Sequence, residues 1–543
     1  MTRGRLSLNV FMNMLSTVVN ALSGFVTLPL LVGRLGAESY GLWTLIVAVA
    51  GYFLVLDFGV SSAVGRLVAA SRARSDVAGL NAVLSTTLVL LLGVCALVVV
   101  ASCFVPIPFF WFFHVPAAQT DDVRSALLLV GVTTALSFPS TVFSGFLWGY
   151  ERFDLHNLVE IPVLLARLGL IVWLIGADST LLDLAWILSG TSVAGFLTRV
   201  GLCWLVEPRI CFGWRFFSRR VVSEVFIFGT WFSLLTFARA ILPHFATFVI
   251  GHGLGSAAVT AFTIPRLLVA YSNWMLVSAT EVIAPRAAVF HFGQQHTQQR
   301  DLFVIGGRYS LAVGLYLLGG LILLGHPLLS VWQPDLQGEE YRLLVILILG
   351  EILPLSQWVT YNTIVSMGRH RRLAIFGFAE GLMVLALAAA LVSPFGLPGV
   401  AVAVAVAGFL FRGLLQWLYG CAVVGISPLR YAKRVFLSVT AATLIPLAAL
   451  GAARVWITPE TWFGVLSLGA LYSLLYWPLL LLHLLGRQQA ADLARSTMRI
   501  VAGRAGSKAA RADLVDAPCV PQDRRRTAMP VAAGRTLRRG QQE

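Results

Sequence analysis

Two arginines inside long apolar stretches, Arg239 and Arg266, are the residues of this sequence with the clearest chemical meaning. An arginine at bilayer depth costs roughly 2.5–3.5 kcal/mol on insertion scales, so it needs a partner, water or a ligand. Two guanidinium groups on adjacent antiparallel helices would together favour an anion. We therefore expect this pair to bind the anionic part of a substrate.

Acidic residues and a histidine inside the apolar stretches admit more than one role. Glu351 could carry a coupling proton or balance an arginine, and Asp57 could take part in coupling or pair with loop arginines. His244 could titrate, although a single histidine at such a position more often packs as a neutral residue. The sequence leaves these alternatives open.

Three further arginines at depth have structural explanations. Arg199 and Arg412 lie towards one end of their stretches, where we expect their side chains to reach the membrane surface. Arg167 follows Glu160 by two turns on one helical face, about 10 Å along the axis, which suits a charge network inside the bundle. For Arg167 a role in the site stays open.

A polar stripe runs along the first apolar stretch. Its members are spaced by four or three residues, which places them on one helical face: Asn9, Asn13, Ser16, Asn20, Ser23 and Thr27. Side chains of this kind also mediate helix packing, but the length of the stripe favours a face that lines a water-filled cavity. Residues 224–250 carry a similar polar set, so we expect both stretches to face that cavity.

The composition indicates that lipid is the main solvent of this protein. Of 543 residues 58% are hydrophobic and 12% are charged, and the mean hydropathy is +0.83. The net charge of +15 reflects membrane topology and contact with anionic lipid, and it is no indication of nucleic-acid binding. Neither lysine lies in a glycine-rich phosphate loop, and no Cys/His cluster has metal-ligand spacing. We therefore expect neither a cofactor nor a metal.

Apolar stretches long enough for one helical crossing recur along the chain. Fourteen are predicted, at residues 9–33, 40–64, 79–105, 125–148, 157–177, 181–205, 224–250, 257–284, 309–331, 343–367, 373–394, 397–421, 436–457 and 462–485. Basic residues are concentrated in the connections on the same side of the membrane as the N-terminus. The connections on the other side hold only Arg34, Arg124, Arg342 and Arg454. The positive-inside rule therefore predicts an all-α, multi-pass membrane protein with cytoplasmic N- and C-termini.

An internal repeat divides the membrane region. Residues 193–199 (VAGFLTR) match residues 406–412 (VAGFLFR) at six of seven positions, and Leu35-Gly36 recurs 219 residues later as Leu254-Gly255. Six helices per copy is an even number, so both copies enter the membrane from the same side and are related by an axis along its normal. Substrate is then expected between two pseudo-symmetric lobes, near mid-membrane.

The repeat and the composition together predict five regions. They are a six-helix lobe at 1–206, a cytoplasmic linker at 207–223, a second six-helix lobe at 224–424, an appended helix pair at 425–485 and a tail at 486–543. The tail is basic and poor in aromatic residues, so we expect it to be disordered and to lie on anionic inner-leaflet lipid.

Several short motifs follow one another in a characteristic order. They are Leu28-Pro29-Leu30, Leu35-Gly36-Ala37-Glu38-Ser39-Tyr40-Gly41, Leu56-Asp57-Phe58-Gly59, Gly149-Tyr150-Glu151-Arg152-Phe153 with Asn157, and Ile250-Gly251-His252-Gly253-Leu254-Gly255. In order and spacing they resemble polysaccharide and oligosaccharide-lipid flippases of the multidrug/oligosaccharidyl-lipid/polysaccharide exporter (MOP) superfamily. The resemblance covers residues 1 to about 485.

This resemblance implies two lobes in a V shape, alternating access and no enzymatic activity. The implied substrate is an undecaprenyl-diphosphate-linked sugar unit, moved from the inner to the outer leaflet of a bacterial plasma membrane for cell-surface polysaccharide. Its diphosphate would contact Arg239, Arg266 and, at the outer mouth, Arg34, while the polar helix faces with Asn13, Asn20 and Thr27 solvate the sugar. Many relatives have an acidic residue where this chain has His244.

Three alternatives remain beside this interpretation. A cation-coupled multidrug exporter of the same architecture should prefer an acidic or aromatic cavity, whereas arginines and amides dominate here. A peptidoglycan lipid II flippase would also have fourteen helices. A scaffold that recruits polysaccharide assembly proteins through its tail should fail on truncation at Leu485, whereas a flippase should largely survive it.

Overall fold

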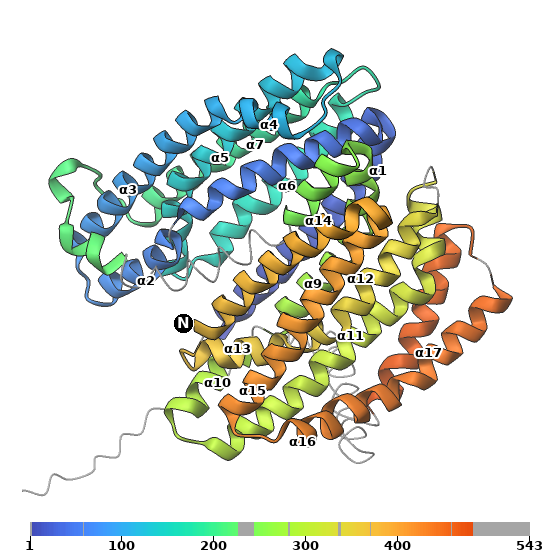
Figure 1. Ribbon diagram of the computed structural model, residues 1–543. Coiled ribbons are helices and arrows are strands. Elements are labelled where there is room, and N and C mark those ends of the chain that lie inside the picture. Colours follow the sequence, from blue (N-terminus) through green and yellow to red (C-terminus); the bar gives the residue numbers. More distant parts are fainter. Residues whose placement is uncertain are drawn as a thin grey trace, which may run out of the picture. The chain divides into compact units, whose positions relative to one another are not determined.

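The protein is helical throughout the part described by the structure, a computed structural model that covers residues 3–57, 59–225, 244–280, 283–334, 338–369, 371–457 and 459–481. All regular elements in these residues are helices (Figure 1). A helix satisfies its own backbone hydrogen bonds, which is the requirement for an apolar segment in lipid. The predicted all-α architecture is thus confirmed for this part of the chain.

The first half of the chain contains seven labelled α-helices. They are α1 (Arg3–Phe53), α2 (Val60–Ala73), α3 (Val77–Phe104), α4 (Pro106–Phe112), α5 (Thr120–Gly149), α6 (Phe153–Leu174) and α7 (Leu181–Val206). Short 3-10 turns accompany them: η1 (Leu54–Asp57), η2 (Ala117–Gln119) and η3 (Trp214–Phe216). Residues 219–225 are again helical.

The second half begins with helical residues 244–253. The elements that follow are α9 (Ser256–Thr280), α10 (Ile283–Phe292), α11 (His296–Trp332), α12 (Glu339–Ser356), α13 (Trp358–Ser366), α14 (Arg371–Gly408), the π-helix η4 (Phe409–Leu415), α15 (Gln416–Val424), α16 (Pro428–Ala432), the π-helix η5 (Lys433–Leu437) and α17 (Ser438–Trp456). The last described helix is Trp462–Leu481.

Two very long helices are each divided by a glycine. The backbone of Gly36 in α1 has φ 84°, and that of Gly396 in α14 has φ 60°, both in the left-handed region that glycine adopts without steric penalty. Gly255, the counterpart of Gly36 in the sequence repeat, has φ 87°. The repeat therefore extends from residue identity to backbone conformation.

Ten helices in the described residues are long and apolar enough to cross a membrane. Two of them, Met12–Asp57 and Arg371–Val424, have 46 and 54 residues and contain the dividing glycines, so each has the length of two crossings. Most of the predicted seventh span (224–250) and the whole predicted tail (486–543) lie outside the described residues. The total of fourteen crossings stays a prediction.

Most helix packing occurs within one half of the chain. In the first half α5 lies against α2, α3 and α7, and α1 lies against α6. In the second half α12 lies against α9, α11 and α14, while α17 of the predicted appended pair lies against α11. The main contact between the halves joins α1 to α9.

The halves meet at the end that the arginine distribution assigns to the outside. The hydroxyl of Thr260 donates a hydrogen bond to the carbonyl of Ala37 (2.6 Å). Gly41 packs so closely on α9 that a Cβ added to it would lie 1.8 Å from the carbonyl oxygen of Ser256. α1 and α9 are therefore in close contact at this end of the two halves.

We expect Gly41→Ala to weaken the contact between α1 and α9. The added methyl group fits beside Ser256 only if the two helices separate, so the variant should lose on the order of 1–3 kcal/mol, measured as a lower unfolding temperature in detergent. Gly33→Ala is the matched control, because a Cβ there meets nothing within 4 Å. Equal unfolding temperatures for the two variants would show that the close approach is unimportant.

Candidate functional site

A cavity of about 380 Å³, with charged and hydroxyl groups in its lining, lies in the first half between α5, α6 and α7. Hydroxyl groups from one face of α5 line it: Thr133, Ser137, Ser140, Thr141 and Ser144. Facing them are the titratable side chains His156, Glu160 and Arg167 of α6 and Arg199 of α7. Charged and hydroxyl groups thus share one space within the membrane-spanning region.

The two arginines of this first-half cavity have different partners. Arg199 forms an ion pair with Glu160 through Nη2 and donates from Nη1 to the hydroxyl of Ser140 (3.3 Å); its side chain is only 14% exposed. Arg167 instead donates to the hydroxyls of Thr191 (3.0 Å) and Ser192 (3.2 Å). Two guanidinium groups therefore face one carboxylate, and the cavity wall carries an excess of positive charge.

A smaller cavity of about 70 Å³ lies in the second half, and Glu380 and Arg412 of a second charge cluster line it. Beside it Arg412 donates two hydrogen bonds to Glu351, Nη2 to Oε1 (2.5 Å) and Nη1 to Oε2 (3.0 Å). Its Nε donates to Oε1 of Glu380 (2.7 Å). Two carboxylates share one guanidinium group, so this cluster has an excess of negative charge. Aromatic residues line the cavity around it: Trp358, Tyr361, Phe376 and Phe411.

The two charge clusters are counterparts in the repeat. Arg199 and Arg412 are the last residues of the matching heptapeptides, and Glu160 and Glu380 lie 220 residues apart, close to the repeat offset of 219. A Cβ at Gly408 would lie 2.6 Å from Nη2 of Arg412, so this glycine leaves room for the guanidinium group. Each half thus pairs an arginine of its sixth predicted span with a glutamate of its fifth.

The prediction that Arg199 and Arg412 reach the membrane surface is wrong. Each guanidinium group is held by a carboxylate on a neighbouring helix, which satisfies its charge within the bundle. For Glu351 the structure shows the second of the two alternatives, an ion pair with an arginine.

Two of the predicted substrate residues connect α1 to α6. Arg34 donates from Nη1 to the carbonyls of Val172 (2.8 Å) and Ile175, where a cation interacts favourably with the carboxyl end of the helix. The side-chain oxygen of Asn13 accepts a hydrogen bond from the amide of Asn157 (2.5 Å). Both residues therefore position the first helix, whatever else they contact.

Arg266 and His244 lie where the two halves meet. Arg266 is half-buried on α9, close enough to Tyr40 and His244 for electrostatic interaction. The ring of His244 lies 5.9 Å from that of Tyr52. Arg239 lies outside the described residues, so its partnership with Arg266 stays a prediction.

The other predicted residues are Asn20, Thr27 and Asp57. Asn20 is exposed on α1, Thr27 is half-buried on the same helix, and Asp57 is half-buried in η1. The structure does not place them among the residues that line the two cavities described above. Their roles in solvating the sugar or in coupling remain predictions.

The hydroxyl face of α5 is the feature that the sequence prediction missed. Thr133, Ser137, Ser140 and Ser144 recur at helical spacing, as the polar residues of the first span do. The same search applied to residues 125–148 would have identified this face. Without it, Arg167 and Arg199 had no visible polar surroundings.

The sequence has recognisable relatives. A profile of the family described as polysaccharide biosynthesis protein matches residues 6–291. A curated protein of Shigella flexneri named "Putative O-antigen transporter" is 20% identical over 421 residues, which cover 76% of this chain and 97% of that protein.

Solved transporters have a similar fold. An inward-facing multidrug resistance MATE family transporter of the MOP superfamily matches with a TM-score of 0.65 at 16% identity, covering 78% of this chain and 97% of its own. The lipid II flippase MurJ in an inward closed conformation matches with a TM-score of 0.64 at 14% identity, covering 86% and 97%. At these identities the similarity shows the fold alone. With more than half of its length matched by the family profile, the chain belongs to the polysaccharide biosynthesis protein family, as the order of its sequence motifs predicted.

Proposed function

We propose that the protein moves a polyprenyl-diphosphate-linked oligosaccharide from the inner to the outer leaflet of a bacterial plasma membrane by alternating access. Membership of the polysaccharide biosynthesis family supports this cargo, and so does the name of the Shigella flexneri relative. In this proposal both termini are cytoplasmic, and the product feeds cell-surface polysaccharide assembly. The prenyl chain remains in lipid while the polar headgroup crosses.

The first-half cavity is the observation that carries the proposal. Guanidinium groups bind phosphate oxygens with charge-assisted hydrogen bonds, and Arg167 and Arg199 outnumber the one carboxylate beside them. The hydroxyls of α5 suit the hydroxyl groups of a sugar. A volume of about 380 Å³ lies within the range of small-molecule sites.

The residues predicted from the sequence keep a place in this proposal. Arg239, Arg266 and His244 would contact the diphosphate where the two halves meet, with Arg34 nearer the outer end. The stripe on α1 (Asn13, Asn20 and Thr27) would face the sugar. Glu351 is proposed to take the coupling proton, because its cluster has one carboxylate more than guanidinium groups, with Asp57 as the alternative.

Replacing both Arg239 and Arg266 with alanine should abolish surface polysaccharide while the protein level stays normal. The reason is loss of the cations proposed to receive the diphosphate at the interface. Sugar-stained extracts measure the surface polysaccharide, and an immunoblot of the same cells measures the protein level. Arg124→Ala/Arg342→Ala, two exposed arginines in predicted outer connections, is the matched control. Normal polymer in the first variant would remove these two residues from the site.

Two assays separate the proposal from its alternatives of the same fold. A cationic drug would meet an excess of positive charge in the first-half cavity, so expression should give no drug resistance. Loss of the protein should remove surface polysaccharide and leave peptidoglycan synthesis intact. Drug resistance would favour a multidrug exporter, and arrested peptidoglycan synthesis a lipid II flippase.

A further inference from the structure

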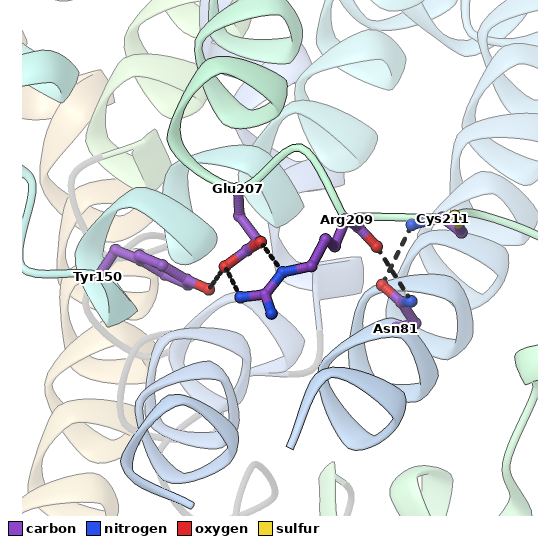
Figure 2. A network of polar contacts seen from close by, with 5 residues as sticks. All are labelled: Asn81, Tyr150, Glu207, Arg209 and Cys211. Atoms are coloured by element: carbon purple, nitrogen blue, oxygen red, sulfur yellow. Dashed lines mark hydrogen bonds and ion pairs between the residues drawn. The ribbon is translucent and has the colours of Figure 1, made fainter. Parts of the chain in front are cut away.

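The segment that follows α7 is bonded to α3. Asn81, near the start of α3, accepts a hydrogen bond from the backbone N–H of Cys211 (3.1 Å) and donates to the carbonyl of Arg209 (3.4 Å) (Figure 2). In the same network Glu207 joins Arg209 to the hydroxyl of Tyr150 (Figure 2). The side-chain amide of Asn81 thus fixes the first part of the predicted linker.

The turn η3 is held on both of its sides by the same helix. Before it, the backbone N–H of Gly213 donates to the hydroxyl of Ser85 (3.3 Å). After it, the backbone N–H of Ser218 donates to the hydroxyl of Thr86 (2.9 Å). Ser85 and Thr86 are buried. The side chains between these anchors therefore project from a backbone with a fixed position on the first half.

Two large apolar side chains project from this turn into the surroundings. Trp214 is 76% exposed and Phe217 is exposed, and their ring centroids lie 5.8 Å apart. The last turn of α7 exposes Trp204 and Leu205 just before the linker. Exposed apolar side chains therefore continue from the end of α7 onto the linker, and tryptophan is a residue type enriched at membrane interfaces.

Ion pairs account for two of the four arginines of the segment. Arg209 pairs with Glu207 (2.7 Å), and Arg220 pairs with Glu224 (2.9 Å). The hydrogen bond from Arg209 holds the pKa of Glu207 below its ordinary value, so this pair stays ionised at neutral pH.

Arg215 and Arg219 are the two arginines of this segment that take no part in these ion pairs. Both are exposed, and in the part of the chain that the structure describes neither forms an ion pair with a carboxylate. The guanidinium group of Arg215 lies 4.7 Å from the centroid of the Phe216 ring. Two uncompensated cations thus accompany the exposed aromatic pair.

We propose that Trp214, Arg215, Phe217 and Arg219 form a binding site for the headgroup of an anionic phospholipid of the inner leaflet, called here the linker site. Guanidinium groups bind phosphate, the inner leaflet has a negative surface potential, and an exposed tryptophan suits the membrane interface better than a water-facing protein contact. Because Asn81, Ser85 and Thr86 fix the segment to α3, the bound lipid anchors the first half of the transporter. The linker site is independent of the proposed cargo and of the predicted tail.

The test uses the full-length protein in detergent, titrated with phosphatidylglycerol or with neutral phosphatidylcholine. Phosphatidylglycerol should raise the unfolding temperature of the wild-type protein more than phosphatidylcholine does. Arg215→Gln/Arg219→Gln should need about tenfold more phosphatidylglycerol for the same rise. Trp214→Ala should weaken the response to both lipids, because the apolar anchor acts on either headgroup.

Arg430→Gln/Arg434→Gln is the matched control, with two exposed arginines at the start of the predicted appended pair, on the predicted cytoplasmic side. Without lipid both double variants should unfold at the wild-type temperature, because the altered side chains are exposed. An equal loss of response in the two double variants would mean general surface attraction and would overturn the linker site. No preference of the wild type for phosphatidylglycerol, or capture of an acidic protein by the linker instead, would also overturn it.

Discussion

Replacing Arg412 with glutamine should destabilise the protein by about 3–5 kcal/mol, because removing one member of a buried ion-pair cluster leaves uncompensated charge. The substitution removes the guanidinium group that pairs with Glu351 and Glu380, whose side chains are 13% and 4% exposed. Thermal unfolding in detergent measures the effect, and membrane protein levels should fall with it.

A triple variant, Glu351→Gln/Glu380→Gln/Arg412→Gln, should recover most of that stability because it removes the charges together. Arg430→Gln, which alters an exposed arginine of α16, should unfold like the wild type. If the Arg412 variant is as stable as the wild type, the ion pairs of this cluster do not stabilise the fold. A triple variant that stays folded and inactive would support the coupling role proposed for Glu351.

Arg167→Gln should reduce transport about tenfold or more while the protein stays folded. A charge-assisted hydrogen bond contributes about 1.5–3 kcal/mol. Within the described residues this guanidinium group donates to the hydroxyls of Thr191 and Ser192 and not to a carboxylate. Glutamine keeps a donor for these hydroxyls and loses the charge. Flipping of a fluorescent polyprenyl-diphosphate-linked disaccharide in proteoliposomes measures the rate.

The control for this prediction is Arg124→Gln, an exposed arginine of the same half whose guanidinium group lies over the ring of Phe110. Its transport rate should equal that of the wild type. An unchanged rate in the Arg167 variant would contradict a diphosphate contact in the first-half cavity. An equal loss in both variants would point to general electrostatic attraction of the cargo.

Hydropathy and arginine placement predicted the helical architecture because lipid imposes these patterns on every span. Gly36 is an example: the sequence predicted two spans around it, and in the structure two helical segments meet at this glycine, whose backbone is in the left-handed region. The repeat also predicted correctly that residues 193–199 and 406–412 are equivalent, because both place an arginine in a counterpart ion pair.

The partners of the intramembrane arginines could not be predicted from the sequence. Glu351 and Glu380 lie 61 and 32 residues before Arg412, and apolar helices of similar composition pack in several ways. Arg199 and Arg412 were therefore assigned to the membrane surface on position alone. Pairing depends on which helix faces bury together, and hydropathy does not encode that choice when lipid and protein are equally apolar.

The unequal charge of the two counterpart clusters bears on how such a transporter diversifies. Duplicated segments begin with identical chemistry, yet here the arginine of one copy faces a single glutamate with a second arginine nearby, and that of the other faces two glutamates. Under the proposed function, mutations on the hydroxyl face of α5 can alter cargo recognition without altering the ion pairs of the distant copy. Recognition and coupling can then change through separate mutations within one chain.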